Sequence, residues 1–331
     1  MNNSFDRALW DKLSQDPLSL GLVRRRILPT LKHDVYIGEL RPSREHVLIL
    51  EISGANDGLP GRRPSSKGLK VDVEKSTSNL VKIQLTSTSQ AETSLFIELV
   101  DDVVGVLAAA PGDGAARRVL ERIVAWQAFF STMRDGFSVE QAAGLFAELH
   151  ILRQAFMPTV GAAQAVDAWH GPDPALQDFQ FGALAVEVKS FRGTGPGHLA
   201  VNSERQLELA GLENLYVAYV RLDQRQIGTG CTLLEAIDSL RTVIIDSAPA
   251  ASLLEQRLLS YGWHDSYAEF RTEKYEVRSN ELFHVEDGFP RITSFGLPNG
   301  VGGVSYSVDR SAIEEFRVPW GVFASVLKES K

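Results

Sequence analysis

The segment from Leu176 to Ser190 constrains the fold most strongly, because its pattern predicts a tight β-hairpin with two unlike faces. Gly182-Ala183 fits a two-residue loop, which would place Phe179 opposite Val186 and Asp178 opposite Glu187. Side chains alternate between the faces of a strand. One face is therefore expected to be apolar, with Phe179, Phe181, Leu184, Val186 and Val188. The opposite face is expected to be polar, with Asp178, Gln180, Glu187 and Lys189.

The polar face of this hairpin carries a charge conflict. Carboxylates that lie directly opposite each other are roughly 5 Å apart and destabilise a sheet unless a positive group separates them. A divalent cation would resolve the conflict, and Mg²⁺ is usually held by one or two carboxylates together with water and phosphate oxygens. Lys189 could then orient or deprotonate a water molecule, or stabilise charge that develops on a phosphorus centre. A plain salt bridge from Lys189 to both carboxylates would explain the same pattern without a metal.

A predicted helix over residues 139–156 supplies a third carboxylate. It begins with the capping-box pattern Ser138-x-x-Gln141. Its apolar stripe consists of Leu145, Leu149, Leu152 and Phe156. Glu148 lies beside this stripe and is expected to point toward the semi-buried side, where an unpaired carboxylate is costly. One lysine cannot balance three carboxylates, so Glu148 favours the metal site over the salt bridge.

Four segments of the chain carry a resemblance, and they are the helix with Glu148, the run Trp169-His-Gly-Pro, Asp178, and Val186-Glu-Val-Lys-Ser190. Together they resemble the PD-(D/E)XK nuclease superfamily. They are similar to a group of members encoded among prokaryotic restriction and phage-defence genes. The resemblance implies an α/β (α+β) fold with a restriction-endonuclease-like core, in which helices flank a central mixed sheet. It also implies catalytic residues and metal ligands. The implied catalytic residues are Asp178, Glu187, Lys189, Glu148 and Gln206, and the implied ligands for Mg²⁺, or Mn²⁺ in its place, are Asp178, Glu187, Glu148 and Val188.

Two of these assignments have alternatives. Asp173, in the dipeptide Pro172-Asp173, could be the first acidic residue of the motif, but we favour Asp178 because the hairpin pairing places it across from Glu187. Gln206 matches a glutamine that some superfamily members use to position the site. Ser203-x-x-Gln206 is equally well explained as the capping box of a helix that begins there.

The remainder of the chain predicts three parts. Residues 1–108 are expected to form a β-rich N-terminal domain that binds DNA or a partner, residues 109–265 the nuclease-like core, and residues 266–331 a C-terminal extension packed on the core. The expected N-terminal strands are residues 35–40, 46–52, 69–74, 80–86 and 95–104. The segment 109–115 is expected to mark a boundary into a helix that runs to about Met133. Further helices are expected over 232–245 and over about 249–261, and a buried strand over 214–220.

Composition limits the class of protein. The single cysteine, Cys231, excludes an intramolecular disulfide and a cysteine-based zinc cluster, and it fits a reducing cytoplasm. No apolar run reaches the length of a membrane span. The formal net charge of −8 argues against a non-specific nucleic-acid coat. The basic clusters Arg24-Arg25-Arg26 and Arg62-Arg63 could contact phosphates, although a solvated surface explains them as well.

The sequence therefore predicts a Mg²⁺-dependent DNA endonuclease in a prokaryotic restriction or anti-phage defence system. The main rival is a non-catalytic DNA-binding or assembly subunit of such a system, which would serve an ATPase or a methyltransferase. DNA and such defence proteins are the expected partners, and a homodimer is a further expectation.

Overall fold

The computed structural model describes residues 8–53, 65–66, 69–75, 80–87, 93–109, 112, 114–132, 137–171, 177–195 and 197–330. The chain divides into two compact units, Met1–Arg134 and Asp135–Lys331. This division differs from the predicted boundaries after residues 108 and 265. Within the described ranges, no helix combines the length and the apolar character needed to cross a membrane.

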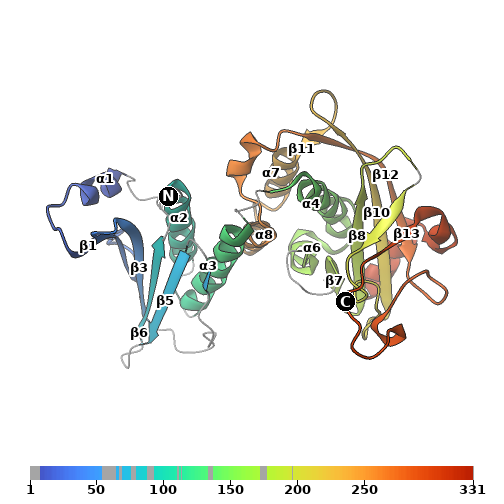
Figure 1. Cartoon of the computed structure of the whole chain (residues 1–331), viewed down its shortest axis with the longest axis horizontal. Helices are drawn as coiled ribbons and strands as arrows, with labels where there is room; N and C mark the ends of the chain where they lie inside the picture. Colours follow the sequence, from blue (N-terminus) through green and yellow to red (C-terminus); the bar gives the residue numbers. More distant parts are fainter. Residues whose placement is uncertain are drawn as a thin grey trace. The chain divides into compact units, whose positions relative to one another are not determined.

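Unit 1 contains an antiparallel sheet with helices beside it (Figure 1). In sheet order, its strands are β1 (Gly21–Ile27), β2 (Asp34–Arg41), β3 (Glu45–Ser53), β6 (Leu80–Ser87), β5 (Leu69–Lys75) and β4 (Ser65–Ser66). Its helices are α1 (Ala8–Ser14), α2 (Thr93–Ala109) and α3 (Ala115–Thr132). Helix α2 packs against α3 and β3, and the Trp126 indole donates a hydrogen bond to Asp102 across the two helices at 2.7 Å.

Two predictions for unit 1 were wrong. The segment 95–104, predicted as a strand, lies inside helix α2. Its buried residues are spaced three or four apart, as on one face of a helix, and they are Phe96, Leu99, Val100, Val103, Val104 and Leu107. The helix ending near Met133 exists as α3, but it belongs to unit 1 and not to the core.

The basic cluster Arg24-Arg25-Arg26 lies on β1, a strand that the sequence analysis did not predict. Arg24 pairs with Glu51 at 3.9 Å, and Arg26 pairs with Asp34. These cross-strand pairs fit the solvated-surface explanation of the cluster. The second cluster, Arg62-Arg63, lies outside the described residues.

Unit 2 is built on a mixed sheet. In sheet order, its strands are β11 (Cys231–Thr232), β12 (Lys274–His284), β10 (Asn214–Arg225), β8 (Leu184–Phe191) and β7 (Phe179–Phe181), with β14 (Arg317–Val318) beside β12. Strands β8 and β10 are parallel, and the other pairs are antiparallel. The buried strand predicted over 214–220 is confirmed and extends to Arg225.

The two faces of this sheet have different covers (Figure 1). One face packs against helices, which are α4 (Val139–Ile151), α5 (Met157–Val160), α6 (Ala162–Ala168), α7 (Leu233–Val243), α8 (Ala248–Tyr261) and α9 (Trp320–Glu329). A π-helical turn, Leu152–Phe156, joins α4 to α5. The other face packs against the two-stranded sheet of β9 (His198–Val201) and β13 (Tyr306–Asp309) and the 3₁₀ turns Arg310–Phe316.

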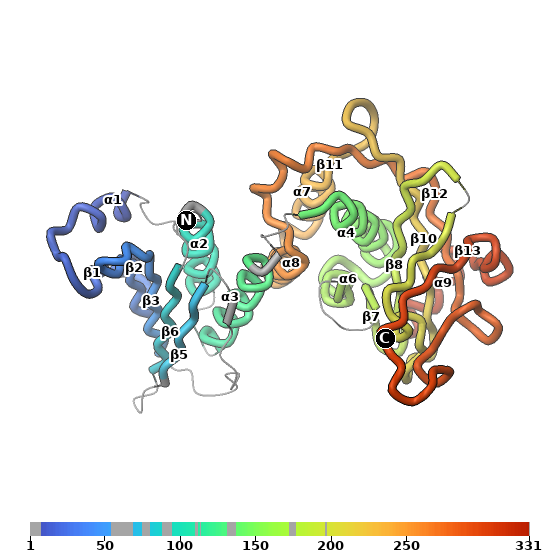
Figure 2. Tube along the Cα trace, in the orientation of Figure 1, coloured from blue at the N-terminus to red at the C-terminus, as the bar shows by residue number. Residues whose placement is uncertain are grey.

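Two further predictions were wrong in unit 2. The segment after residue 266, expected as an extension, supplies β12 to the middle of the sheet, where it pairs with β10 from Tyr216↔His284 to Arg225↔Lys274. The residues after Ser203, expected to begin a helix, form turns instead. The tube in Figure 2 shows that the chain returns at its C-terminal end to the β7–β8 hairpin. There the Ser330 carbonyl lies against Gly182, whose φ of +59° also favours glycine.

Candidate active site

The β7–β8 hairpin has the predicted register. Phe179 pairs with Val186, Gln180 with Ala185 and Phe181 with Leu184, around Gly182-Ala183. The predicted apolar face is also confirmed, because its five residues lie in or against the core cluster on the helical side. Strand β7 begins only at Phe179, so within the described residues no strand pairs with this edge of β8 beyond Val186.

Asp178 lies at this open edge of β8. Its Oδ2 atom accepts a hydrogen bond of 2.6 Å from the backbone N–H of Val188, and its own carbonyl accepts one of 2.7 Å from His170. The first bond fixes the Asp178 carboxylate beside Glu187, the residue that precedes Val188 on β8. Asp173, the alternative motif residue, lies outside the described residues.

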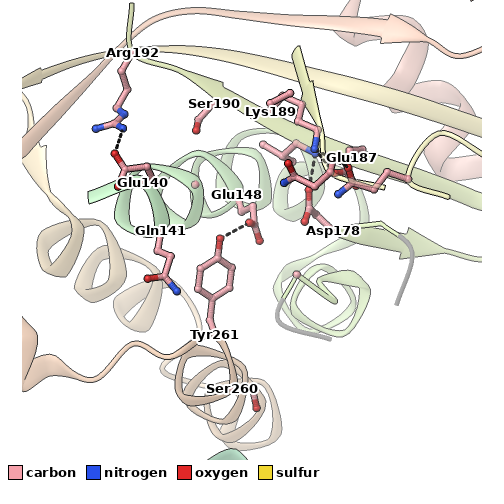
Figure 3. Close-up of a pocket in the computed structure, with 16 residues that line it drawn as sticks. Glu140, Gln141, Glu148, Asp178, Glu187, Lys189, Ser190, Arg192, Ser260 and Tyr261 are labelled. Atoms are coloured by element: carbon pink, nitrogen blue, oxygen red, sulfur yellow. Dashed lines mark hydrogen bonds and ion pairs between the residues drawn. The ribbon is translucent and has the colours of Figure 1, made fainter. Parts of the chain in front are cut away.

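A cavity of about 630 Å³ opens at this edge (Figure 3). Four carboxylates line it, from Glu140, Glu148, Asp178 and Glu187, together with the cationic side chains of Lys189 and Arg192. Val188, Ser190, Asn202, Gln206 and Tyr261 are among its other lining residues. All six residues predicted for the site thus border one cavity, and their roles remain predictions.

Lys189 is held between two oxygen atoms. Its Nζ lies 2.7 Å from Oε1 of Glu187 and donates a hydrogen bond of 3.2 Å to Oε1 of Gln206. The same Gln206 oxygen accepts a hydrogen bond of 2.8 Å from the backbone N–H of Asn202. Gln206 therefore closes a turn and holds Lys189 at once. Among the residues that the structure describes, Lys189 forms no ion pair with Asp178, so the plain salt bridge to both carboxylates is not observed.

Glu148 is held by two neutral donors. Its Oε1 accepts a hydrogen bond of 2.8 Å from the Tyr261 hydroxyl, and its Oε2 accepts one of 2.8 Å from the Trp169 indole N–H. Trp169 is fully buried, and its indole N–H serves the site. The sequence analysis missed Tyr261 altogether.

The three central carboxylates are electrostatically strained. The pKa of Glu148 is raised from 4.5 to about 7, chiefly by burial and also by the nearby Glu187 charge, against the opposing hydrogen bonds from Trp169 and Tyr261. Burial, followed by the charges of Glu187 and Glu148, raises the pKa of Asp178 well above its usual range. Burial also raises the pKa of Glu187, although Lys189 opposes this effect. Ionising all three carboxyls would thus place more negative charge in the site than Lys189 offsets.

A hard divalent cation fits this donor set, because carboxylate oxygens are its preferred ligands and its charge would relieve the repulsion. Glu187 is buried, whereas Asp178 keeps part of its surface open to the cavity. Within the described part of the chain, no three His, Cys, Asp or Glu side chains converge as a ready set of ligands. The residues therefore fit a cation held by two carboxylates better than an all-protein cage.

A comparison with protein families shows which family the chain belongs to. A family model described as "Putative PD-(D/E)XK family member, (DUF4420)" matches residues 7–311. The chain belongs to this PD-(D/E)XK family. Its fold is the predicted one, a mixed α+β core of the nuclease superfamily with a β-rich N-terminal region. PD-(D/E)XK nucleases typically use divalent metals. A comparison with curated proteins found no match, and neither did a comparison with solved structures.

Proposed function

We propose that this PD-(D/E)XK protein is a metal-dependent DNA endonuclease that hydrolyses phosphodiester bonds. The observation that supports it best is the gathering of Asp178, Glu187 and Glu148 with one lysine around a single cavity at the open edge of β8. The proposed setting, a prokaryotic restriction or anti-phage defence system, is carried over from the resemblance of the sequence.

The proposed roles are those that the resemblance implies, and the way the side chains are held supports them. Asp178 and Glu187 would hold Mg²⁺, or Mn²⁺ in its place, with Glu148 assisting and Val188 as a further proposed ligand. A bound divalent cation would supply positive charge at the scissile phosphate and lower the pKa of water. Lys189, fixed by Glu187 and Gln206, would orient the attacking water or stabilise charge on the phosphate oxygens.

The acidic cavity would make DNA binding depend on the metal. Four carboxylates face two cationic side chains there, so a phosphate would be repelled until a divalent cation offsets part of the negative charge. Arg192 is the second cationic side chain, and its guanidinium is held by Glu140 at 2.8 Å and Gln224 at 2.6 Å. We assign Arg192 to a flanking DNA phosphate, because guanidinium groups match phosphate oxygens well.

The rival function is a non-catalytic DNA-binding or assembly subunit that serves an ATPase or a methyltransferase. Such a subunit has no use for enclosed carboxylates that repel one another. Placing them together costs folding stability, so their presence favours the enzyme.

A plasmid cleavage assay tests the proposal. Wild type, Lys189→Ala and the matched control Lys328→Ala, an exposed lysine on α9, are incubated with supercoiled DNA and Mg²⁺ or Mn²⁺, with and without chelator. We expect metal-dependent nicking in wild type and the control, and none in Lys189→Ala. Equal nicking by all three proteins would expose a contaminating nuclease and contradict the proposal. Binding of several DNA forms without any cutting would favour the rival subunit.

A further inference from the structure

Glu148 is the one central carboxylate of the site that the hairpin does not position. It lies on α4, and its two hydrogen-bond donors come from elsewhere in the chain. The Trp169 indole follows α6, 21 residues away, and the Tyr261 hydroxyl comes from the last residue of α8, 113 residues away. Figure 3 shows the Tyr261 hydroxyl reaching Glu148 from the side of the cavity opposite the hairpin. Three helical segments therefore meet at one carboxylate.

Two glycines leave the space that this arrangement needs. A Cβ atom at Gly171 would overlap Oε2 of Glu148, and it would lie 2.7 Å from the Trp169 indole nitrogen. A Cβ atom at Gly144, one turn before Glu148 on α4, would lie 3.1 Å from the Tyr261 hydroxyl. Glycine inside a helix costs about 1 kcal/mol relative to alanine. The glycine that leaves space for the Tyr261 hydroxyl therefore lowers the stability of helix α4.

The chemical nature of the two donors matters. Glu187 is paired with a cation, Lys189, which offsets its charge. Glu148 accepts hydrogen bonds only from neutral groups among the described residues, so its orientation is fixed without an ion pair. A carboxylate held in this way can attract a cation that Asp178 and Glu187 hold, because no cationic side chain in the described part of the chain forms an ion pair with it.

We propose that Tyr261 is a positioning residue of the site, whose hydroxyl, with the Trp169 indole, fixes the Glu148 carboxylate toward Asp178 and Glu187 without neutralising it. This inference rests on the proposed metal-dependent function. Tyr261 acts through Glu148 and contacts neither the metal nor DNA. Loss of such an outer partner typically costs about 10-fold to 100-fold in metal affinity or activity.

The test compares Tyr261→Phe with Tyr275→Phe. The first substitution removes only the hydroxyl that holds Glu148. The second removes a hydroxyl from a tyrosine that is 1% exposed and whose hydroxyl has no hydrogen-bond partner among the described residues. Calorimetric titration of the full chain with Mn²⁺ and with Mg²⁺, without DNA, measures affinity independently of cleavage. We expect Tyr261→Phe to bind about 10-fold or more weakly, and to lower kcat for nicking without changing KM for DNA. Tyr275→Phe should match wild type.

A double-mutant cycle separates positioning from general packing. If Tyr261 acts through Glu148, adding Tyr261→Phe to Glu148→Gln should lower metal affinity no further than Glu148→Gln alone. The inference is overturned if Tyr261→Phe lowers metal affinity as much in the Glu148→Gln background as in wild type. It is also overturned if Tyr261→Phe alone binds metal as tightly as wild type. If wild type binds metal but never cuts DNA, the endonuclease proposal fails, while the affinity of Tyr261→Phe still decides the role of Tyr261. If wild type binds neither metal, both fail.

Discussion

The substitution Glu148→Gln should stabilise the metal-free protein at high pH while it impairs the site. Glutamine has the shape of glutamate, so its carbonyl can accept the Trp169 N–H and its amide can donate to the Tyr261 oxygen. The substitution therefore removes the charge and keeps the hydrogen bonds. Any change in stability then reports the cost of ionising Glu148 inside the fold.

The sign and size follow from the pKa. Burial raises the pKa of Glu148 from 4.5 to about 7 in the folded protein. A carboxyl group with a raised pKa costs nothing at a pH below 4.5, where it is protonated in both states. The cost grows as the pH rises and is complete above about 7. At about 1.4 kcal/mol per pH unit, this rise corresponds to roughly 3 kcal/mol.

Urea unfolding at pH 5 and pH 8.5, with a chelator present, measures this effect. We expect Glu148→Gln to lie within about 1 kcal/mol of wild type at pH 5, and to be up to about 3 kcal/mol more stable at pH 8.5. The exposed Glu269→Gln serves as the control and should change stability equally little at both pH values. A gain that is the same at both pH values, or a loss at pH 8.5, would refute the reasoning. Adding Mg²⁺ should stabilise wild type more than Glu148→Gln.

Three further substitutions test other parts of the site. Arg192→Ala should weaken DNA binding uniformly across sequences and reduce the slope of log affinity against log salt by about 1. Its ion-pair partner Glu140 is 74% exposed, so the free energy of unfolding in urea should change by less than about 1 kcal/mol. Gly171→Ala should displace the Glu148 carboxylate and weaken Mn²⁺ binding in calorimetry, because the new Cβ overlaps Oε2; unchanged binding would contradict this contact. Phe179→Ala should lower the free energy of unfolding in urea by about 3–5 kcal/mol, because the ring is fully buried.

The parts of the site that sequence predicted are those that local patterns determine. The hairpin register follows from strand alternation around a two-residue turn, and the structure has the same pairs. The start of α4 follows from its capping box, in which Ser138 and Gln141 exchange hydrogen bonds of 3.1 and 2.9 Å. Both patterns span fewer than ten residues, so competing contacts elsewhere did not change them.

The same capping pattern failed after Ser203. Ser203 Oγ accepts from Arg205 at 3.2 Å, and Gln206 Oε1 accepts from Asn202 at 2.8 Å, but no helix follows. The same Gln206 oxygen accepts its second hydrogen bond from Lys189. A capping pattern thus specifies one turn, and tertiary contacts decide whether a helix continues from it.

Other elements were unpredictable because their signals are not local. The run 95–104 is rich in Val, Ile and Leu, so it matched a strand by composition, and the helical spacing of its buried residues decided otherwise. Strand β12 lies in the segment expected as an extension, and only its pairing with β10 places it inside the sheet. Tyr261 carries no local signal, because its relation to Glu148 exists only once α8 packs near α4.

The two halves of the site are held by different kinds of contact, which determines how each responds to substitution. Asp178 is fixed by a backbone N–H of β8, a donor that a side-chain substitution at Val188 does not remove. Glu148 is fixed only by side-chain donors among the described residues, and each can be lost in one substitution. The hairpin half should therefore survive the loss of both donors, and a protein without them should retain a weakened site of two carboxylates. Of the two donors, Trp169 is buried in the core and its backbone pairs with Phe179 of β7, so the Tyr261 hydroxyl is the contact that substitution can remove with less effect on the sheet.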